Sequence, residues 1–164
     1  MQKVIISAGI GFYLTPLALY EYYKLKGIDV FIYERRCDYR DRKNEKDFFM
    51  YMQRLTLKQI LKNNFKESYG GFYTFKSDHG YKVYEESDSG QCDLFQGDDW
   101  VYESFSSLES RMDKDLITVF EKLGQKSTFA GHKILEIEDG IELELHEGQC
   151  GGGDWVEEKH RHWN

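Results

Sequence analysis

The chain has 164 residues, 40% of them hydrophobic and 16% aromatic, which suits one compact domain over residues 1–164 and excludes a disordered linker. Its three cysteines lie far apart, which excludes a disulfide framework and favours a reducing, cytoplasmic compartment. The net charge of −7 is divided, because residues 1–66 hold 13 Lys and Arg against 7 Asp and Glu, whereas residues 67–164 hold 9 against 22. This division indicates either complementary surfaces or an anion site in the first half, and duplex DNA is excluded because acids interrupt every basic run.

The start of the chain predicts a strand, a helix and a second strand. Lys3–Ser7 is a short β-branched run that is typical of a buried strand. Thr15 caps a helix over Pro16–Lys26, which Gly27 ends, and residues 28–34 form the second strand. This order predicts a β-α-β unit with two parallel strands. The expected fold class is therefore α/β or mixed α+β, with helices and antiparallel hairpins after this unit.

A run without charges near the start is not predicted to cross a membrane. Val4–Tyr20 is uncharged, but Gly9, Gly11 and Pro16 interrupt it, and it is short for a membrane-spanning helix. We read it as a buried strand followed by a helix.

The middle of the chain alternates charged loops with short apolar elements. Residues 35–47 and 86–99 are expected to be exposed charged loops. Phe48–Met52 fits either a strand or the start of a helix. Thr56 caps a helix that runs to about Asn63.

Two hairpins are predicted. Phe72–Lys76 and Tyr81–Glu85 are separated by a short gap that contains glycine, which favours a hairpin. The second hairpin joins Ile134–Ile137 to Ile141–Leu145 through Asp139–Gly140, a two-residue turn of the primed type. Apolar and polar residues alternate in its second strand, so one face is expected to be buried and the other wet.

Three further elements are predicted in the second half. Trp100–Phe105 fits a strand. Asp113 caps a helix over Lys114–Leu123 with one apolar face, and Gly124 ends it. Residues 155–164 contain two tryptophans and are too apolar to hang free, so this tail is expected to dock on the domain or on a neighbouring subunit.

The loop before the first helix is the first candidate site. Backbone amides at a helix start bind anions, and glycines allow a phosphate to approach closely. Two glycines match the dinucleotide fingerprint, but Leu14 stands in place of the third. A purely structural turn also requires glycine. The ligand-binding interpretation takes six residues, including the acid at the end of the second strand, where such folds hold a ribose: Gly9, Gly11, Thr15, Glu34, Arg35 and Arg36.

A second candidate site lies near the C-terminus. His146, Cys150, His160 and His162 are ligand types that suit zinc, but the paired Cys-x2-Cys elements of a zinc ribbon are missing. Surface histidines beside a flexible loop are the alternative, and it is the one we favour. No metal or other cofactor is therefore expected.

Both ends of the chain resemble a family of small uncharacterised proteins from bacteriophages and large DNA viruses. The resemblance is carried by the opening Lys-Val-Ile-Ile-Ser-Ala, the segment Asp113–Gly124, the turn at Asp139–Gly140 and the tail Trp155–Trp163. It covers the first 35 residues and about the last 55, whereas the middle of the chain departs from it. It implies a viral source and the cytoplasm of an infected cell, and it implies no activity.

These observations lead to one functional hypothesis and a rival. The first is a viral accessory protein without enzymatic activity that binds a small anion or a nucleotide, for example to sequester a host signal. The rival is an oligomeric interaction or virion-associated protein without a small ligand. None of the usual catalytic signatures occurs in the sequence, which disfavours an enzyme. In either case a homo-oligomer is expected.

Overall fold

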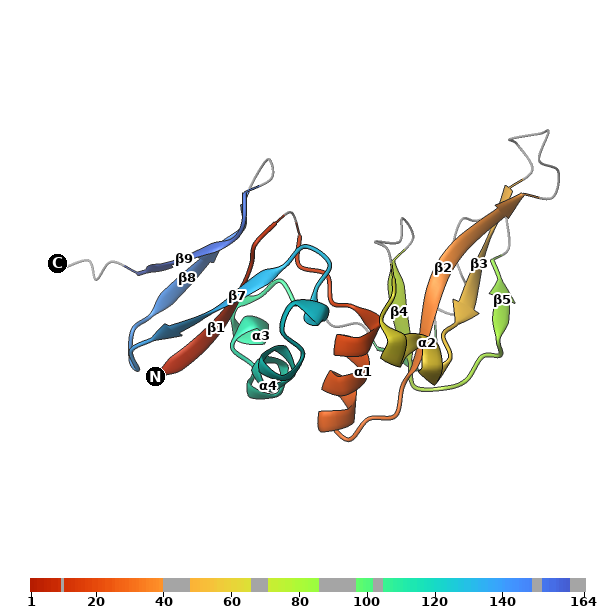
Figure 1. The fold of residues 1–164 in the computed structure, drawn as a ribbon, viewed down its shortest axis with the longest axis horizontal. Helices are drawn as coiled ribbons and strands as arrows, with labels where there is room; N and C mark the ends of the chain where they lie inside the picture. Colours follow the sequence, from red (N-terminus) through yellow and green to blue (C-terminus); the bar gives the residue numbers. More distant parts are fainter. Residues whose placement is uncertain are drawn as a thin grey trace. The chain divides into compact units, whose positions relative to one another are not determined.

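The computed structural model describes residues 1–9, 11–39, 48–65, 71–85, 97–101, 105–148 and 152–159. The chain divides into two compact units, Met1–Lys26 with Ser104–Asn164 (unit 1) and Gly27–Glu103 (unit 2), and each is described by itself (Figure 1). The mixture of helices and strands confirms the mixed α and β class. The single domain stays a prediction. No helix within the described ranges is long and apolar enough to cross a membrane.

The parallel β-α-β unit is a wrong prediction. Strand β1 (Gln2–Ser7) pairs antiparallel with β7 (His132–Ile137), so that Val4 lies opposite Leu135. The helix after β1, α1 (Pro16–Leu25), has the predicted Thr15 cap and first-turn proline. The second strand, β2 (Phe31–Tyr39), belongs to unit 2 and pairs with antiparallel neighbours there. The local signals gave the elements correctly, but they carry no information about which strand is the partner.

Unit 1 packs helices against the β1–β7 ribbon. Its other helices are α3 (Leu108–Arg111), α4 (Lys114–Leu123) and the 3-10 helix η2 (Gly124–Ser127). The predicted Asp113 cap of α4 is confirmed, since its carboxylate accepts from two backbone amides of the first turn. Beyond this cap, Asp113 also binds the Lys26 ammonium at 2.8 Å, which connects the start of α4 to the end of α1.

A second ribbon completes unit 1. Strand β8 (Leu143–His146) pairs antiparallel with β9 (Trp155–Glu158). The predicted hairpin between the segments that become β7 and β8 is therefore wrong. The Gln2 side chain donates to the backbone oxygens of Glu138 and Ile141, so β1 holds this connection. The tail follows β8 as a strand, while residues 160–164 lie outside the described part.

Unit 2 is built on one antiparallel sheet of five strands in the order β5-β3-β2-β4-β6. Its core contains Tyr33, Met52 and Phe75, all fully buried. The further strands and the helix are β3 (Phe48–Arg54), β4 (Phe72–Phe75), β5 (Lys82–Tyr84), β6 (Trp100–Val101) and α2 (Leu57–Lys62).

The predicted hairpin between the segments that become β4 and β5 is also wrong, because β2 and β3 separate them in the sheet. The connection between them is held by Tyr33, whose hydroxyl donates to the Gly80 oxygen at 2.8 Å and accepts from the His79 amide at 3.0 Å. Because Tyr33 lies on β2, this bonding ties the connection to the middle of the sheet.

The structure decides two other predictions in unit 2. Residues 35–39 continue strand β2 instead of starting a loop, and residues 40–47 lie outside the described part. The segment from Phe48 is a strand, not the start of a helix. The Thr56 cap of α2 is confirmed as a capping box with Gln59, and Asn63 ends this helix in the left-handed conformation.

Candidate functional site

The glycine loop of unit 1 folds around the Ser7 hydroxyl. Ser7 Oγ lies 2.7 Å from the Gly11 oxygen and 3.0 Å from the Gly9 oxygen, and it accepts from the Gly9 amide at 3.3 Å. Gly11 has φ +74°, a backbone conformation that residues other than glycine rarely adopt. A Cβ on Gly9 would lie 3.2 Å from that of Ala130. The backbone conformation at Gly11 and the close approach of Ala130 to Gly9 therefore explain why glycine stands at both positions, without a ligand.

The hydroxyl and the amide of Thr15 form hydrogen bonds within the same unit. Its Oγ1 accepts from the Ala18 amide at 3.3 Å and donates to the Lys126 oxygen at 2.7 Å. Its own amide donates to the Ser127 oxygen at 2.9 Å. Thr15 therefore fixes the start of α1 to η2, and its hydroxyl already has partners on both sides.

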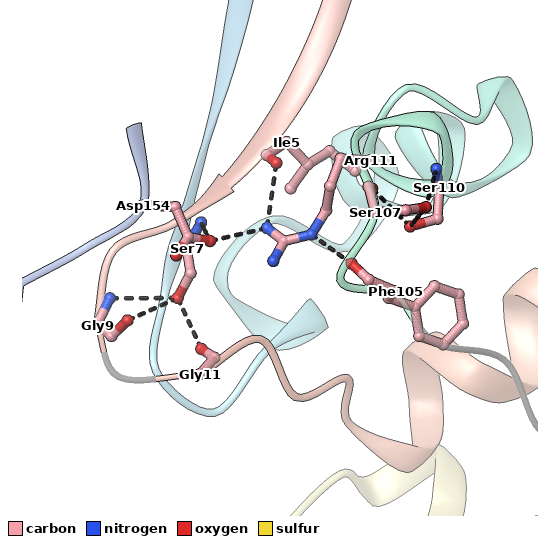
Figure 2. A network of polar contacts seen from close by, with 9 residues as sticks. All are labelled: Ile5, Ser7, Gly9, Gly11, Phe105, Ser107, Ser110, Arg111 and Asp154. Carbon is pink, nitrogen blue, oxygen red and sulfur yellow. Dashed lines mark hydrogen bonds and ion pairs between the residues drawn. The ribbon is translucent and has the colours of Figure 1, made fainter. Parts of the chain in front are cut away.

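A buried ion pair lies next to this loop (Figure 2). The Arg111 side chain is 2% exposed and that of Asp154 is 6% exposed, and Arg111 Nη1 lies 3.0 Å from Asp154 Oδ2. Arg111 also donates to the backbone oxygens of Ile5 and Phe105. Its guanidinium carbon lies 3.6 Å from the centre of the Phe12 ring. The network thus connects α3, β1, the glycine loop and the start of β9.

The two residues of this ion pair form hydrogen bonds with the backbone of β1 along the edge that does not pair with β7. Asp154 accepts from the Ser7 amide through its carboxylate and donates its own amide to the Ser7 oxygen, while Arg111 donates to the Ile5 oxygen. Two side chains and the Asp154 backbone amide therefore satisfy the polar groups of a strand edge where a third strand would otherwise pair. Burial lowers the pKa of Arg111, and the Asp154 carboxylate opposes this shift. Sequence reasoning missed the pair, since no motif connects two residues so far apart.

The other predicted ligand residues lie on β2 in unit 2. Successive side chains of a strand point to opposite faces, so Arg35 lies on one face and Glu34 with Arg36 on the other. Arg35 forms two hydrogen bonds of 2.9 Å with the buried Glu85 carboxylate, which raises the pKa of Arg35. Arg36 Nε donates to Glu34 Oε2 at 2.7 Å and Nη1 to Gln53 Oε1 at 3.0 Å. The structure brings Glu34 and Arg36 together and separates them from Arg35.

Aromatic and cationic side chains continue across this face onto β3 and β5. The Lys82 ammonium lies 4.1 Å from the centre of the Tyr51 ring and 5.0 Å from that of Tyr84. Gln53 donates to the Tyr81 hydroxyl at 2.7 Å. Tyr81 is 52% exposed and Tyr84 is 57% exposed. We call this surface the tyrosine–lysine face, and its members are Arg36, Tyr51, Gln53, Tyr81, Lys82 and Tyr84.

The predicted metal cluster falls mostly outside the described residues. Cys150, His160 and His162 lie in that part, and His146 stacks on Trp155 with ring centres 5.3 Å apart. In the described ranges no three His, Cys, Asp or Glu side chains are grouped so that they could hold a metal ion.

A buried histidine in unit 1 is expected to make its stability depend on pH. The His132 ring packs edge-on against Phe120, with centres 4.4 Å apart, and burial lowers the pKa of His132 below its usual value of about 6.5. The native protein then binds this proton only at a lower pH than the unfolded chain does. We expect the free energy of unfolding to fall as the pH drops below about 6.5.

The measurement is urea denaturation between neutral pH and about pH 5, compared with a His132→Phe variant. Phenylalanine keeps an aromatic ring beside Phe120 but cannot be protonated, so its stability should depend less on pH over this window. Equal dependence in both proteins would contradict the prediction.

The chain was compared with family models, curated proteins and solved structures, and none of them matches it.

Proposed function

We propose that the protein binds a ligand of the nucleotide class on the tyrosine–lysine face of unit 2. The observation that carries the proposal is the position of the Lys82 ammonium, which is within 5.0 Å of the ring centres of both Tyr51 and Tyr84. Such an arrangement offers aromatic surface for a base and positive charge for a phosphate side by side.

The neighbours of Lys82 suit the same chemistry. Arg36 is held in place by Glu34 and Gln53, so its guanidinium is oriented and can bind phosphate oxygens with little loss of side-chain freedom. Gln53 positions two members of the face, since its oxygen accepts from Arg36 and its amide nitrogen donates to the Tyr81 hydroxyl. Glu34 lowers the local positive charge, which favours a ligand with few charges over a polyanion.

The proposal changes the predicted site but keeps part of it. Arg36 remains in it with Glu34 as its partner, whereas hydrogen bonds within unit 1 account for Gly9, Gly11 and Thr15. Binding without turnover is proposed, because the Glu34 carboxylate beside the face is already paired with Arg36. The family resemblance adds the proposal of a viral accessory protein that sequesters a nucleotide in the infected cell.

Replacing Lys82 or Tyr84 by alanine is expected to weaken nucleotide binding about tenfold each, since each removes a stacking or cationic contact. Calorimetric titration with ATP, AMP, inorganic phosphate and a short single-stranded oligonucleotide measures this effect and separates a free nucleotide from a nucleic acid strand. Lys58→Ala on α2, an exposed lysine of the same unit, is the matched control.

Two results would contradict the proposed function. One is the absence of binding of every nucleotide at millimolar concentration. The other is equal weakening by Lys58→Ala and Lys82→Ala, which would indicate an effect of net charge alone.

The rival function, assembly through the Trp-bearing tail, stays a proposal that native mass spectrometry of the full chain tests directly. Residues 155–158 already pair with β8 of the same chain. Truncation after Gly153 would therefore remove a strand and Asp154 from unit 1. Loss of an oligomer in that variant would not distinguish assembly from misfolding, so the intact chain is the better sample.

A further inference from the structure

The β8–β9 ribbon of unit 1 has two different faces. On the inner face Leu143, Leu145 and Val156 pack with Val4 and Ile6. The outer face carries Glu144 directly opposite Glu157, and His146 directly opposite Trp155. Both glutamates are exposed, and Trp155 is 46% exposed.

An open cavity of about 720 Å³ lies at the end of the ribbon where β8 ends and β9 begins. Two aromatic residues, His146 and Trp155, line part of it, and their rings are stacked with an angle of 14° between the planes. The lining residues are Leu145, His146, Glu147, Gly148, Gly152 and Trp155.

Glu157 fixes the aromatic wall of the cavity. Its Oε1 accepts from the Trp155 indole nitrogen at 3.2 Å, and its Oε2 lies 3.5 Å from His146 Nε2. Nε2 of His146 is itself buried and has no hydrogen-bond partner among the residues that the structure describes. The Glu157 carboxylate therefore holds the indole by a hydrogen bond and lies beside the His146 ring.

The charge on the ribbon is strongly acidic. Like charges directly opposite each other on a strand pair are destabilising, and the pair Glu144–Glu157 is of this kind. A cationic ligand would relieve this repulsion. Residues 142–148 and 152–159 contain six acids, Glu142, Glu144, Glu147, Asp154, Glu157 and Glu158, against Lys159 as the one basic residue apart from His146. Glu144 and Glu157 lie on the same face as the two rings, whereas Asp154 is paired with Arg111.

We infer that this cavity binds the guanidinium group of an arginine in a basic segment of a partner protein. A guanidinium is flat and stacks on an indole, and it pairs with carboxylates through two parallel hydrogen bonds. Trp155 supplies the aromatic surface, Glu147 supplies a carboxylate in the cavity lining, and Glu144 supplies a second one on the same ribbon face as Trp155. The cavity residues belong to unit 1 and bind a cation, whereas the nucleotide proposed for unit 2 is an anion. The inference therefore does not rest on the proposed function.

The test uses a short oligoarginine peptide with a fluorescent label, titrated with the full-length protein and followed by fluorescence anisotropy. Oligolysine of equal length is the comparison, because it has the same charge but no flat group. We expect Trp155→Leu and Glu144→Gln to weaken oligoarginine binding about fivefold or more, and oligolysine to bind more weakly than oligoarginine. Glu138→Gln is the matched control, since Glu138 is an exposed acid of the same unit outside the ribbon.

Three results would overturn the inference. The first is absence of oligoarginine binding at physiological salt. The second is equal weakening by Glu138→Gln and Glu144→Gln, which would show attraction to net charge. The third is unchanged binding in Trp155→Leu. Circular dichroism of each variant shows whether unit 1 is folded, and Trp155→Phe, which keeps an aromatic ring, should recover part of the affinity.

Discussion

Replacing Arg111 by methionine is expected to lower the free energy of unfolding by about 3–5 kcal/mol. The substitution leaves the Asp154 carboxylate buried without its counter-charge, and it leaves the oxygens of Ile5 and Phe105 without their donor. Both effects cost stability, because a buried charge or acceptor without a partner has lost its hydration and gained nothing in return.

Urea denaturation followed by tryptophan fluorescence measures this effect. In a Trp100→Phe background the remaining tryptophans, Trp155 and Trp163, belong to unit 1, so the signal reports on that unit. Lys122→Met is the matched control, because Lys122 is 60% exposed and pairs with Glu21 at the surface, where ion pairs contribute little.

The double variant Arg111→Met with Asp154→Asn tests whether the two residues act as a pair. Asparagine keeps an oxygen that can accept from the Ser7 amide but carries no charge. The loss in the double variant should therefore be clearly smaller than the sum of the two single losses. Additive losses, or a loss below about 1 kcal/mol for Arg111→Met, would show that the ion pair does not hold the edge of β1.

The helices could be predicted from the sequence because their signals are local. The structure confirms three helix starts, and in each the side chain of the capping residue accepts from a backbone amide within three residues. The capping residues are Thr15, Thr56 and Asp113. A cap depends only on the residues beside it, so its chemistry can be read without knowing the fold.

Strand pairing could not be predicted in the same way. The alternation in residues 141–145 correctly indicated a strand with one buried face, as Leu143 is buried and Glu144 exposed. However, alternation fixes the faces of a strand and not its neighbours. The adjacent segment that becomes β7 pairs with β1, where Gln2 lies opposite Ile137, and β8 pairs with β9.

The candidate sites show the same limit. Glu34, Arg35 and Arg36 are consecutive in sequence, yet their strand places Arg35 on the opposite face from the other two. The tyrosine–lysine face assembles residues from three strands whose register follows from the sheet. The glycine loop fits a structural turn, which was the alternative to the ligand-binding interpretation. Its partner Ser7 could not be predicted, because a hydroxyl inside a turn leaves no pattern in the sequence.

Replacing Gly153 by alanine is expected to lower the free energy of unfolding by about 3 kcal/mol, because the new Cβ would lie 2.6 Å from the Ser7 oxygen and 3.2 Å from the Ala8 Cα. These are backbone atoms, and they cannot move without disturbing the edge of β1. The hydrogen bond from the Asp154 amide to the Ser7 oxygen should be lost, and with it the position of the Asp154 carboxylate.

Gly140→Ala is the matched control for this variant. Gly140 has φ +83°, but a Cβ there would meet no atom within 4 Å, so alanine at this position adds backbone strain of about 1 kcal/mol without a clash. Hydrogen exchange then separates the two causes. The Asp154 amide should lose its protection in Gly153→Ala and keep it in Gly140→Ala. Protection in both variants would mean that the Asp154 amide bonds to the Ser7 oxygen without the close approach of Gly153, and it would contradict the prediction.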